Sequence, residues 1–187
     1  MANLYPAPTN HITTTDPVTG KSTFHSSPNP PPFIDPLPSF RVHYIYSTTA
    51  SPAGGPPIKD DADLKNYESM AAEPRVHFPT AGGTGGCLVH FSPNPEQTKG
   101  ATHTTSTLDY IFILDGAMEL GLESGETRIL KKGDSAVQRA TKHWWRNTSR
   151  TEPAIMVAVS VGIEGAVEDE MRIEGLGKEG EGKEKGE

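Results

Sequence analysis

The chain has 187 residues, a formal net charge of −7, 34% hydrophobic residues, 19 glycines and 17 prolines. The acidic balance argues against binding to nucleic acid or to an anionic membrane surface, because both rely on clustered Lys and Arg. The length fits one domain, the glycine and proline content favours an all-β protein over a helical bundle, and a single cysteine excludes an internal disulfide.

The chain begins with a predicted hairpin and a proline-rich arm. Thr-rich, β-prone runs within residues 11–24 flank the turn Asp16-Pro17-Val18-Thr19-Gly20, which is typical of a β-hairpin. Residues 27–38 carry repeated prolines, so we expect them to run extended across the surface and not to form a central strand.

A strand and a loop region follow. Residues 41–47 have the residue types of a strand. Residues 50–72 are expected to form a loop, with one weak helical turn around residues 62–70. The glycine cluster at 82–86 lacks the Lys-Ser/Thr ending of a phosphate-binding loop, so we expect no nucleotide site there.

The regular core is predicted from residue 87 onward. Short β-prone runs recur at intervals of roughly ten residues with turn signals between them, a spacing typical of a sandwich or a small barrel. These runs are residues 87–91, 108–114, 117–123, 126–130, 135–138 and 153–161.

The domain organisation predicted from these patterns has three parts. They are a flexible N-terminus at 1–10, one domain at 11–163 with its barrel core at 86–162, and a Gly/Glu/Lys-rich tail at 164–187 that we expect to be disordered. The first residues have neither a basic nor an apolar region of a signal peptide, and no stretch approaches the ~18 apolar residues of a membrane helix. We therefore expect a soluble, cytoplasmic protein.

Polar residues at fixed spacing interrupt the apolar core. These residues are His103, Thr105 and Asp109, and six residues separate Asp109 from Gly116. This run resembles the first motif of the cupin superfamily, His-x-His, three or four residues, Glu, six residues and Gly. Thr105 stands where the second histidine belongs, and Asp109 replaces the glutamate.

A second run agrees with the same family. Gly133-Asp134 opens a turn, and His143 is followed by Asn147 with the spacing of the second cupin motif. Residues 137–147 also resemble one cupin subgroup, with Ala140 in place of a glycine; its genes often lie beside natural-product biosynthetic genes. The resemblance covers about residues 10–162.

The resemblance implies a fold and a partner. The expected fold is an all-β double-stranded β-helix, the cupin jelly-roll barrel, here with an N-terminal hairpin and a proline-rich arm. It also implies a small-molecule substrate held in the barrel and, by analogy with other cupins, a homodimer.

Strand geometry independently supports a site at these residues. His103, Thr105 and Asp109 share parity, so in a continued strand they lie on one face together with two isoleucines that follow, which marks that face as buried. Polar groups are costly there unless they are satisfied, and His143 would complete the set from a neighbouring strand. Perturbed polar groups inside a cavity are candidates for a functional site.

Three interpretations of His103, Asp109 and His143 stay open. They form a two-histidine, one-carboxylate site for Fe, Mn, Ni or Zn. Alternatively the site is metal-free, and Asp109 orients one histidine as a general acid/base pair. In the third interpretation the three residues bond one another and Tyr110 or Arg139 and have no function.

Further residues are predicted to bind substrate. Trp145 would form a wall that stacks on an unsaturated molecule, and Arg139 would bind a carboxylate. Tyr110 lies beside the motif, and His90 shares a face with Leu88 that could enter the pocket. The alternatives are a core tryptophan, an internal ion pair and a surface histidine.

The function expected from sequence is small-molecule tailoring of secondary-metabolite type, by dehydration, decarboxylation or cyclisation, as a lyase or isomerase. The alternatives are a metal-dependent dioxygenase and a non-enzymatic small-molecule binding protein. Most of this expectation comes from fold analogy.

Overall fold

The structure is a computed structural model and describes residues 5–27, 29–52, 55–74 and 78–165. The tail predicted at 164–187 lies almost wholly outside these residues, as do residues 1–4 of the predicted flexible N-terminus. Within the described part, no helix is long and apolar enough to cross a membrane.

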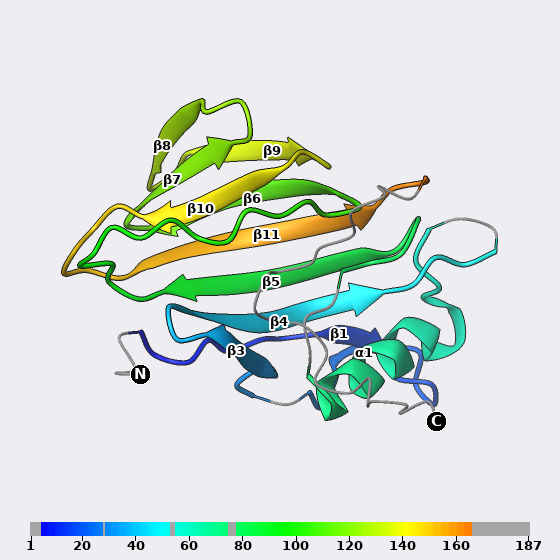
Figure 1. The fold of residues 1–187 in the computed structure, drawn as a ribbon. Coiled ribbons are helices and arrows are strands. Elements are labelled where there is room, and N and C mark those ends of the chain that lie inside the picture. The colour runs from blue at the N-terminus through cyan, green and yellow to red at the C-terminus, as the bar shows by residue number, and fades with distance from the viewer. Residues whose placement is uncertain (1–4, 28, 53–54, 75–77, 166–187) are drawn as a thin grey trace, which may run out of the picture.

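Two facing sheets form the body of the protein. The larger sheet has the strand order β3-β4-β5-β11-β6-β9, and the smaller has the order β10-β7-β8 (Figure 1). The strands of the larger sheet are β3 (Phe33–Leu37), β4 (Phe40–Thr48), β5 (Thr84–Phe91), β6 (Thr107–Asp115), β9 (Ser135–Arg139) and β11 (Ala154–Gly162). Those of the smaller sheet are β7 (Ala117–Leu122), β8 (Thr127–Lys131) and β10 (His143–Asn147).

The pairing confirms the all-β jelly-roll expectation. Neighbouring strands pair antiparallel throughout both sheets, and β11 lies between β5 and β6 although it is last in sequence. The two sheets stay separate in their hydrogen bonding and share one core between them. That core joins Met118, Leu130 and Trp145 of the smaller sheet to residues of the larger one, namely Val89, Ile111, Ile113, Ala154 and Met156.

Several elements differ from the sequence expectation in extent. The predicted single helical turn is a longer helix, α1 (Ala62–Ala72), which follows a short 3₁₀ turn (Lys59–Asp61). β5 begins at Thr84, so the end of the glycine cluster belongs to a strand. The proline-rich arm contributes β3, which lies at the sheet edge, where the missing N–H of Pro36 is tolerated.

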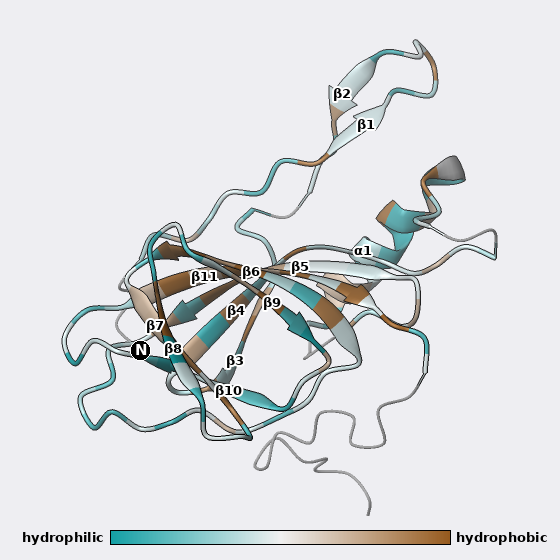
Figure 2. Ribbon diagram, turned by 90° about the horizontal axis from the view of Figure 1, so that it is seen from above, coloured by the Kyte–Doolittle hydropathy of each residue, from teal (hydrophilic) through white to brown (hydrophobic). Residues whose placement is uncertain are grey.

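The predicted hairpin forms from β1 (Thr13–Thr15) and β2 (Ser22–Phe24). It extends away from the two facing sheets (Figure 2). The Asp16 side chain closes its turn by accepting hydrogen bonds from the N–H groups of Val18 and Thr19, both at 2.8 Å.

Candidate active site

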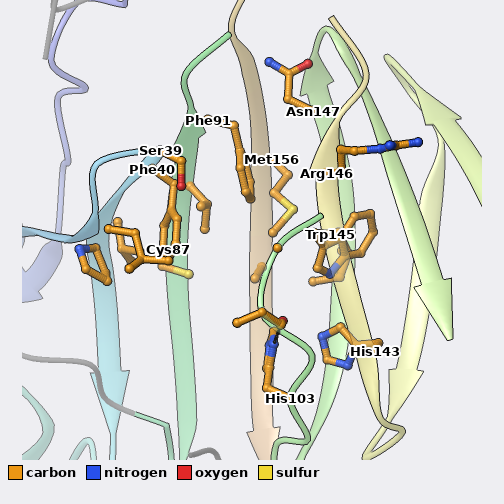
Figure 3. A pocket seen from close by; sticks show the side chains of 18 of the residues that line it. Ser39, Phe40, Cys87, Phe91, His103, His143, Trp145, Arg146, Asn147 and Met156 are labelled. Carbon is orange, nitrogen blue, oxygen red and sulfur yellow. Dashed lines mark hydrogen bonds between the residues drawn. The ribbon is translucent and has the colours of Figure 1, made fainter. Parts of the chain in front are cut away.

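A cavity of about 520 Å³ lies between the two sheets. Its walls on the side of the larger sheet are apolar and come from β4, β5 and β11. A cluster of polar side chains lies where β6, β9 and β10 meet it. The apolar wall includes Phe40, Val42, Val89, Phe91 and Met156, and Figure 3 shows how several of these side chains face the histidines.

His103 and His143 stand side by side in this cavity. The backbone N–H of each donates to the carbonyl oxygen of the other at 2.9 Å, which joins the loop before β6 to the start of β10. Their ring centroids are 4.3 Å apart (Figure 3). The predicted proximity of the two histidines is therefore present, although His103 lies in a loop and not in a strand.

The loop that carries His103 is held by a glycine contact. The N–H of Gly100 donates to the carbonyl oxygen of Trp145 at 3.0 Å. A Cβ atom at Gly100 would lie 2.5 Å from that oxygen, so the approach requires glycine. This close contact fixes the loop one residue before Ala101, whose carbonyl group contacts the His103 ring.

Backbone carbonyl groups set the tautomers of both histidines. The Nδ1 atom of His103 lies 3.0 Å from the carbonyl oxygen of Ala101, and Nδ1 of His143 lies 2.7 Å from that of Thr141. A carbonyl oxygen only accepts hydrogen bonds, so each Nδ1 carries a proton. The Nε2 atom of neither ring has a hydrogen-bond partner among the described residues, which leaves two ring nitrogens for a substrate.

His143 is held neutral by its surroundings. Burial lowers its pKa to about 4, and the neighbouring His103 adds to that shift. At neutral pH the Nε2 atom of His143 therefore bears a lone pair in an apolar cavity. Such an atom can accept a proton from a substrate that lies against it.

Asp109 lies deep in the same cavity but does not orient a histidine. Its side chain is 5% exposed, and its Oδ2 accepts a hydrogen bond from the Thr105 hydroxyl at 3.2 Å. The sequence interpretation in which Asp109 bonds a histidine is wrong in this respect, because Asp109 is bonded to Thr105 and its other oxygen, Oδ1, has no hydrogen-bond partner. The interpretation without a function predicted hydrogen bonds from these residues to Tyr110 or Arg139. Those two residues lie outside the cavity, so that part of the interpretation is wrong as well.

The predicted metal ligands do not fit a three-ligand site. The described residues contain no group of three or more His, Cys, Asp or Glu side chains placed to hold one ion. Thr105, at the position of a histidine ligand in the family motif, instead donates its hydroxyl to Asp109. The two free imidazole nitrogens and the free Oδ1 atom of Asp109 are not placed together around one ion, so the donor set does not fit a metal centre.

One polar residue of the cavity was missed from sequence. Gln138 lies on β9 directly opposite Asp109 on β6, and it is 4% exposed. Its Oε1 accepts a hydrogen bond from the indole N–H of Trp145 at 3.3 Å. Ala136 and Gln138 face inward on β9, while the neighbouring Val137 and Arg139 are exposed, and no local signal in the sequence marks which of these two faces is buried.

Three predicted substrate-binding residues lie outside the cavity, while Trp145 lines it. Tyr110 (42% exposed) and Arg139 belong to the outward faces of β6 and β9. His90 does share a face with Leu88, but that face of β5 points outward. Cys87 and Val89 occupy the inward positions between them, so parity removes His90 from the cavity.

One end of the cavity is covered by the segment before His103. The Arg146 guanidinium donates to the carbonyl oxygen of Gln97 at 2.9 Å and pairs with Glu119. The Asn147 side chain donates to the carbonyl oxygens of Ser92 and Glu152 at 3.0 and 2.8 Å. The asparagine of the second motif therefore uses its amide group to hold two loops in place.

Comparison with known proteins gives a family and several fungal relatives. Residues 87–160 match the family model of the cupin domain. "Phomopsin biosynthesis cluster protein C'" of Diaporthe leptostromiformis is 40% identical over 122 residues, which are 65% of this chain and 60% of that protein. "Oryzines biosynthesis cluster protein J" of Aspergillus oryzae is 38% identical over 96 residues, 51% of each chain.

Another relative has an oxidoreductase name. "Cupin-domain-containing oxidoreductase virC" of Hypocrea virens is 36% identical over 106 residues, 57% of this chain and 50% of that protein. The chain thus spans between half and three fifths of these curated relatives. Among solved structures, a cupin-like protein from Thermotoga maritima superposes with a TM-score of 0.43 at 16% identity, over 68% of this chain and 72% of that one. A likeness of that size carries no information on activity.

Proposed function

Because residues 87–160 form a cupin domain, we propose that this protein is an enzyme of secondary metabolism that acts on a small organic molecule in its cavity. We propose lyase or isomerase chemistry by acid–base catalysis. One observation carries this proposal: His143 presents an unprotonated Nε2 atom inside an apolar cavity, beside a second histidine whose Nε2 is also without a partner. The relatives from biosynthesis clusters support the metabolic setting.

The residues of the chain suffice for the proton transfers of such a reaction. Nε2 of His143 accepts a proton from a carbon atom of the substrate, and the electron pair of the broken C–H bond forms a new double bond. In a dehydration the protonated ring passes this proton to the hydroxyl group on the adjacent carbon, and the C–O bond breaks as water leaves with its electron pair. In an isomerisation the proton returns to another carbon. Two adjacent rings share one proton more easily than they hold two, so His103 and His143 exchange acid and base roles.

Oxidation is the competing reaction class, because several relatives are named oxidoreductases. It differs from acid–base chemistry in one measurable respect. An oxidation changes the number of hydrogen or oxygen atoms in a way that needs an electron acceptor, whereas dehydration, decarboxylation and isomerisation do not. The mass of the substrate relative to its product therefore separates the classes.

The test is deletion of the gene in its source organism, complemented by the wild type, by His143→Gln or by the outward-facing control His90→Gln. We expect an intermediate to accumulate in the deletion and in the His143→Gln strain but not in the control strain. A difference of one water, one carbon dioxide or no mass from the product supports the proposal. A difference of two hydrogens or of added oxygen assigns an oxidoreductase, and an unchanged metabolite profile assigns a binding protein.

A further inference from the structure

Two buried atoms at the polar end of the cavity have no hydrogen-bond partner. They are Oδ1 of Asp109 and Nε2 of Gln138, and both side chains line the cavity. Each side chain is more than nine-tenths buried. An unsatisfied buried polar atom destabilises the folded state, so a pair of them at one place indicates groups arranged for a ligand.

The chemical character of both atoms is fixed by their neighbours. The indole N–H of Trp145 is a donor only, so the Gln138 atom that meets it is the carbonyl Oε1, and the NH₂ group is the free end. The Thr105 hydroxyl donates to Oδ2 of Asp109, which leaves Oδ1 as the free acceptor. Asp109 and Gln138 therefore add one free acceptor and one free donor to the two free Nε2 atoms of the histidines.

These two groups are adjacent. Asp109 and Gln138 are directly paired residues of β6 and β9, and inward-facing partners of this kind have Cβ atoms about 4.5–5.5 Å apart. The terminal torsions of Asp and Gln side chains are soft, so a small turn directs both free atoms to one ligand atom. Ser160 of β11 is the partner of Asp109 on its other side and also lines the cavity, while Ile111, Met156 and Trp145 supply apolar lining.

We propose that Asp109 and Gln138 form a subsite for a hydroxyl group of the substrate, an alcohol, phenol or enol on an otherwise apolar molecule. The hydroxyl donates its proton to Oδ1 of Asp109 and accepts a hydrogen bond from Nε2 of Gln138. A carbonyl oxygen satisfies the amide alone, an ammonium satisfies the carboxylate alone, and a carboxylate is repelled by Asp109. The inference rests on the proposed function, since it names the substrate class for the cavity that holds the two histidines.

Binding of two matched probes tests this subsite without any need for turnover. The probes are 2-naphthol and 2-methoxynaphthalene, in which a methyl group replaces the hydroxyl hydrogen. Affinity is measured by calorimetric titration. The variants are Gln138→Leu, with Gln138→Met as a second replacement should the first not fold. The matched control is Arg139→Leu on the outward face of the same strand.

We expect the wild type and Arg139→Leu to prefer 2-naphthol by about tenfold, because only its hydroxyl group has a proton for Asp109. In Gln138→Leu or Gln138→Met both probes should bind at least threefold more weakly, because the oxygen atom of each accepts the hydrogen bond of the amide. Equal affinity of both probes in the wild type would overturn the subsite and would mean that the amide and the carboxylate satisfy each other. So would unchanged affinity of both probes in the Gln138 variants. A preference for 2-naphthol with affinity that depends on Gln138, together with an unchanged metabolite profile in the deletion strain, would keep the subsite and reject the proposed enzyme.

Discussion

Among the described residues, two pairs of adjacent histidines lie on opposite sides of the larger sheet. His103 and His143 have ring centroids 4.3 Å apart inside the cavity, and His43 and His90 have centroids 4.9 Å apart on the outer face. Burial is the main cause of a lowered pKa in both places, to about 4 for His143 and also to about 4 for His90. The two pairs are thus alike in ring distance and each contains a histidine with a similarly lowered pKa.

Their surroundings differ. The outer pair is packed between aromatic rings, with Phe33 against His43 and Tyr5 against His90, and neither histidine lines the cavity. His43 is 2% exposed. This pair fills space beneath the N-terminal segment.

The cavity pair has the opposite arrangement. Both of its Nδ1 atoms are bound by carbonyl oxygens of their own loops, and both Nε2 atoms are left for a ligand. A lowered pKa therefore does not identify a catalytic histidine in this protein. The feature that distinguishes the proposed catalytic pair is a ring nitrogen lone pair that faces the cavity, and the predictions below separate the two pairs on that basis.

The largest expected effect is on turnover. His143→Gln should reduce the rate of conversion of the accumulated intermediate by about 10²–10⁴-fold, the usual contribution of a general acid–base group. His90→Gln should leave the rate within a few-fold of the wild type. Purified variants and the isolated intermediate provide the measurement. Comparable losses in both variants would mean that the pairs do not differ in the way described.

A smaller effect is expected where the cavity pair is held in place. Gly100→Ala puts a methyl group against the Trp145 carbonyl oxygen, and overpacking of this kind typically costs about 1–3 kcal/mol. Denaturant unfolding measures that loss. Because the loop also carries the carbonyl group that orients His103, activity per folded molecule should fall as well. Gly125→Ala is the control for a methyl group, since nothing lies within 4 Å of its position, although its φ of +88° adds backbone strain.

The pH dependence of stability should reflect both pairs. His90 and His143 have pKa values near 4 in the folded state and about 6.5 when unfolded, so the unfolded chain binds more protons between these values. The free energy of unfolding is then greatest above about pH 6.5 and falls on acidification toward pH 4. Chemical denaturation at a series of pH values should show this slope.

His90→Phe sharpens the comparison further. It should flatten the pH slope of stability, because one histidine with a depressed pKa is removed, and it should leave the pH profile of activity unchanged. A shifted activity profile would place His90 in the reaction after all.

The smallest expected effect is that of chelation. Since Thr105 does not replace the missing histidine ligand and no three-ligand group is assembled in the described residues, treatment with a strong chelator should leave binding of 2-naphthol and turnover unchanged. Elemental analysis before and after treatment is the necessary control. Loss of activity on chelation with recovery on added iron would reinstate the predicted metal site.

Alternation of side chains predicted the part of the site that lies on regular strands. Along residues 108–114 the buried positions are Asp109, Ile111 and Ile113, as their parity required. Parity also predicted the cavity position of His103. In the structure, however, a single backbone bridge to His143 holds it there and not a continued strand. The histidines and the carboxylate were thus identified correctly as neighbours, but their hydrogen-bond partners were not.

The residues that were placed wrongly share one physical cause. Alternation along a strand divides its side chains between two faces but does not say which face is buried. At β5, Leu88 suggested an inward face for His90, but the cavity takes Cys87 and Val89. At β9, Arg139 was predicted to bind substrate, but the buried residue is its neighbour Gln138. Only the pairing of β9 with β6 settles that choice, and this long-range contact leaves no local trace in the sequence.

The account depends most directly on the free Nε2 atom of His143. Long-range ¹H–¹⁵N NMR spectra of histidine-labelled protein at neutral pH report the protonation of each ring nitrogen, and His143→Gln assigns the signal. We predict a neutral ring for His143 with the proton on Nδ1 and an unprotonated Nε2. A proton on Nε2, in the other tautomer or in a doubly protonated ring, would contradict the proposed base.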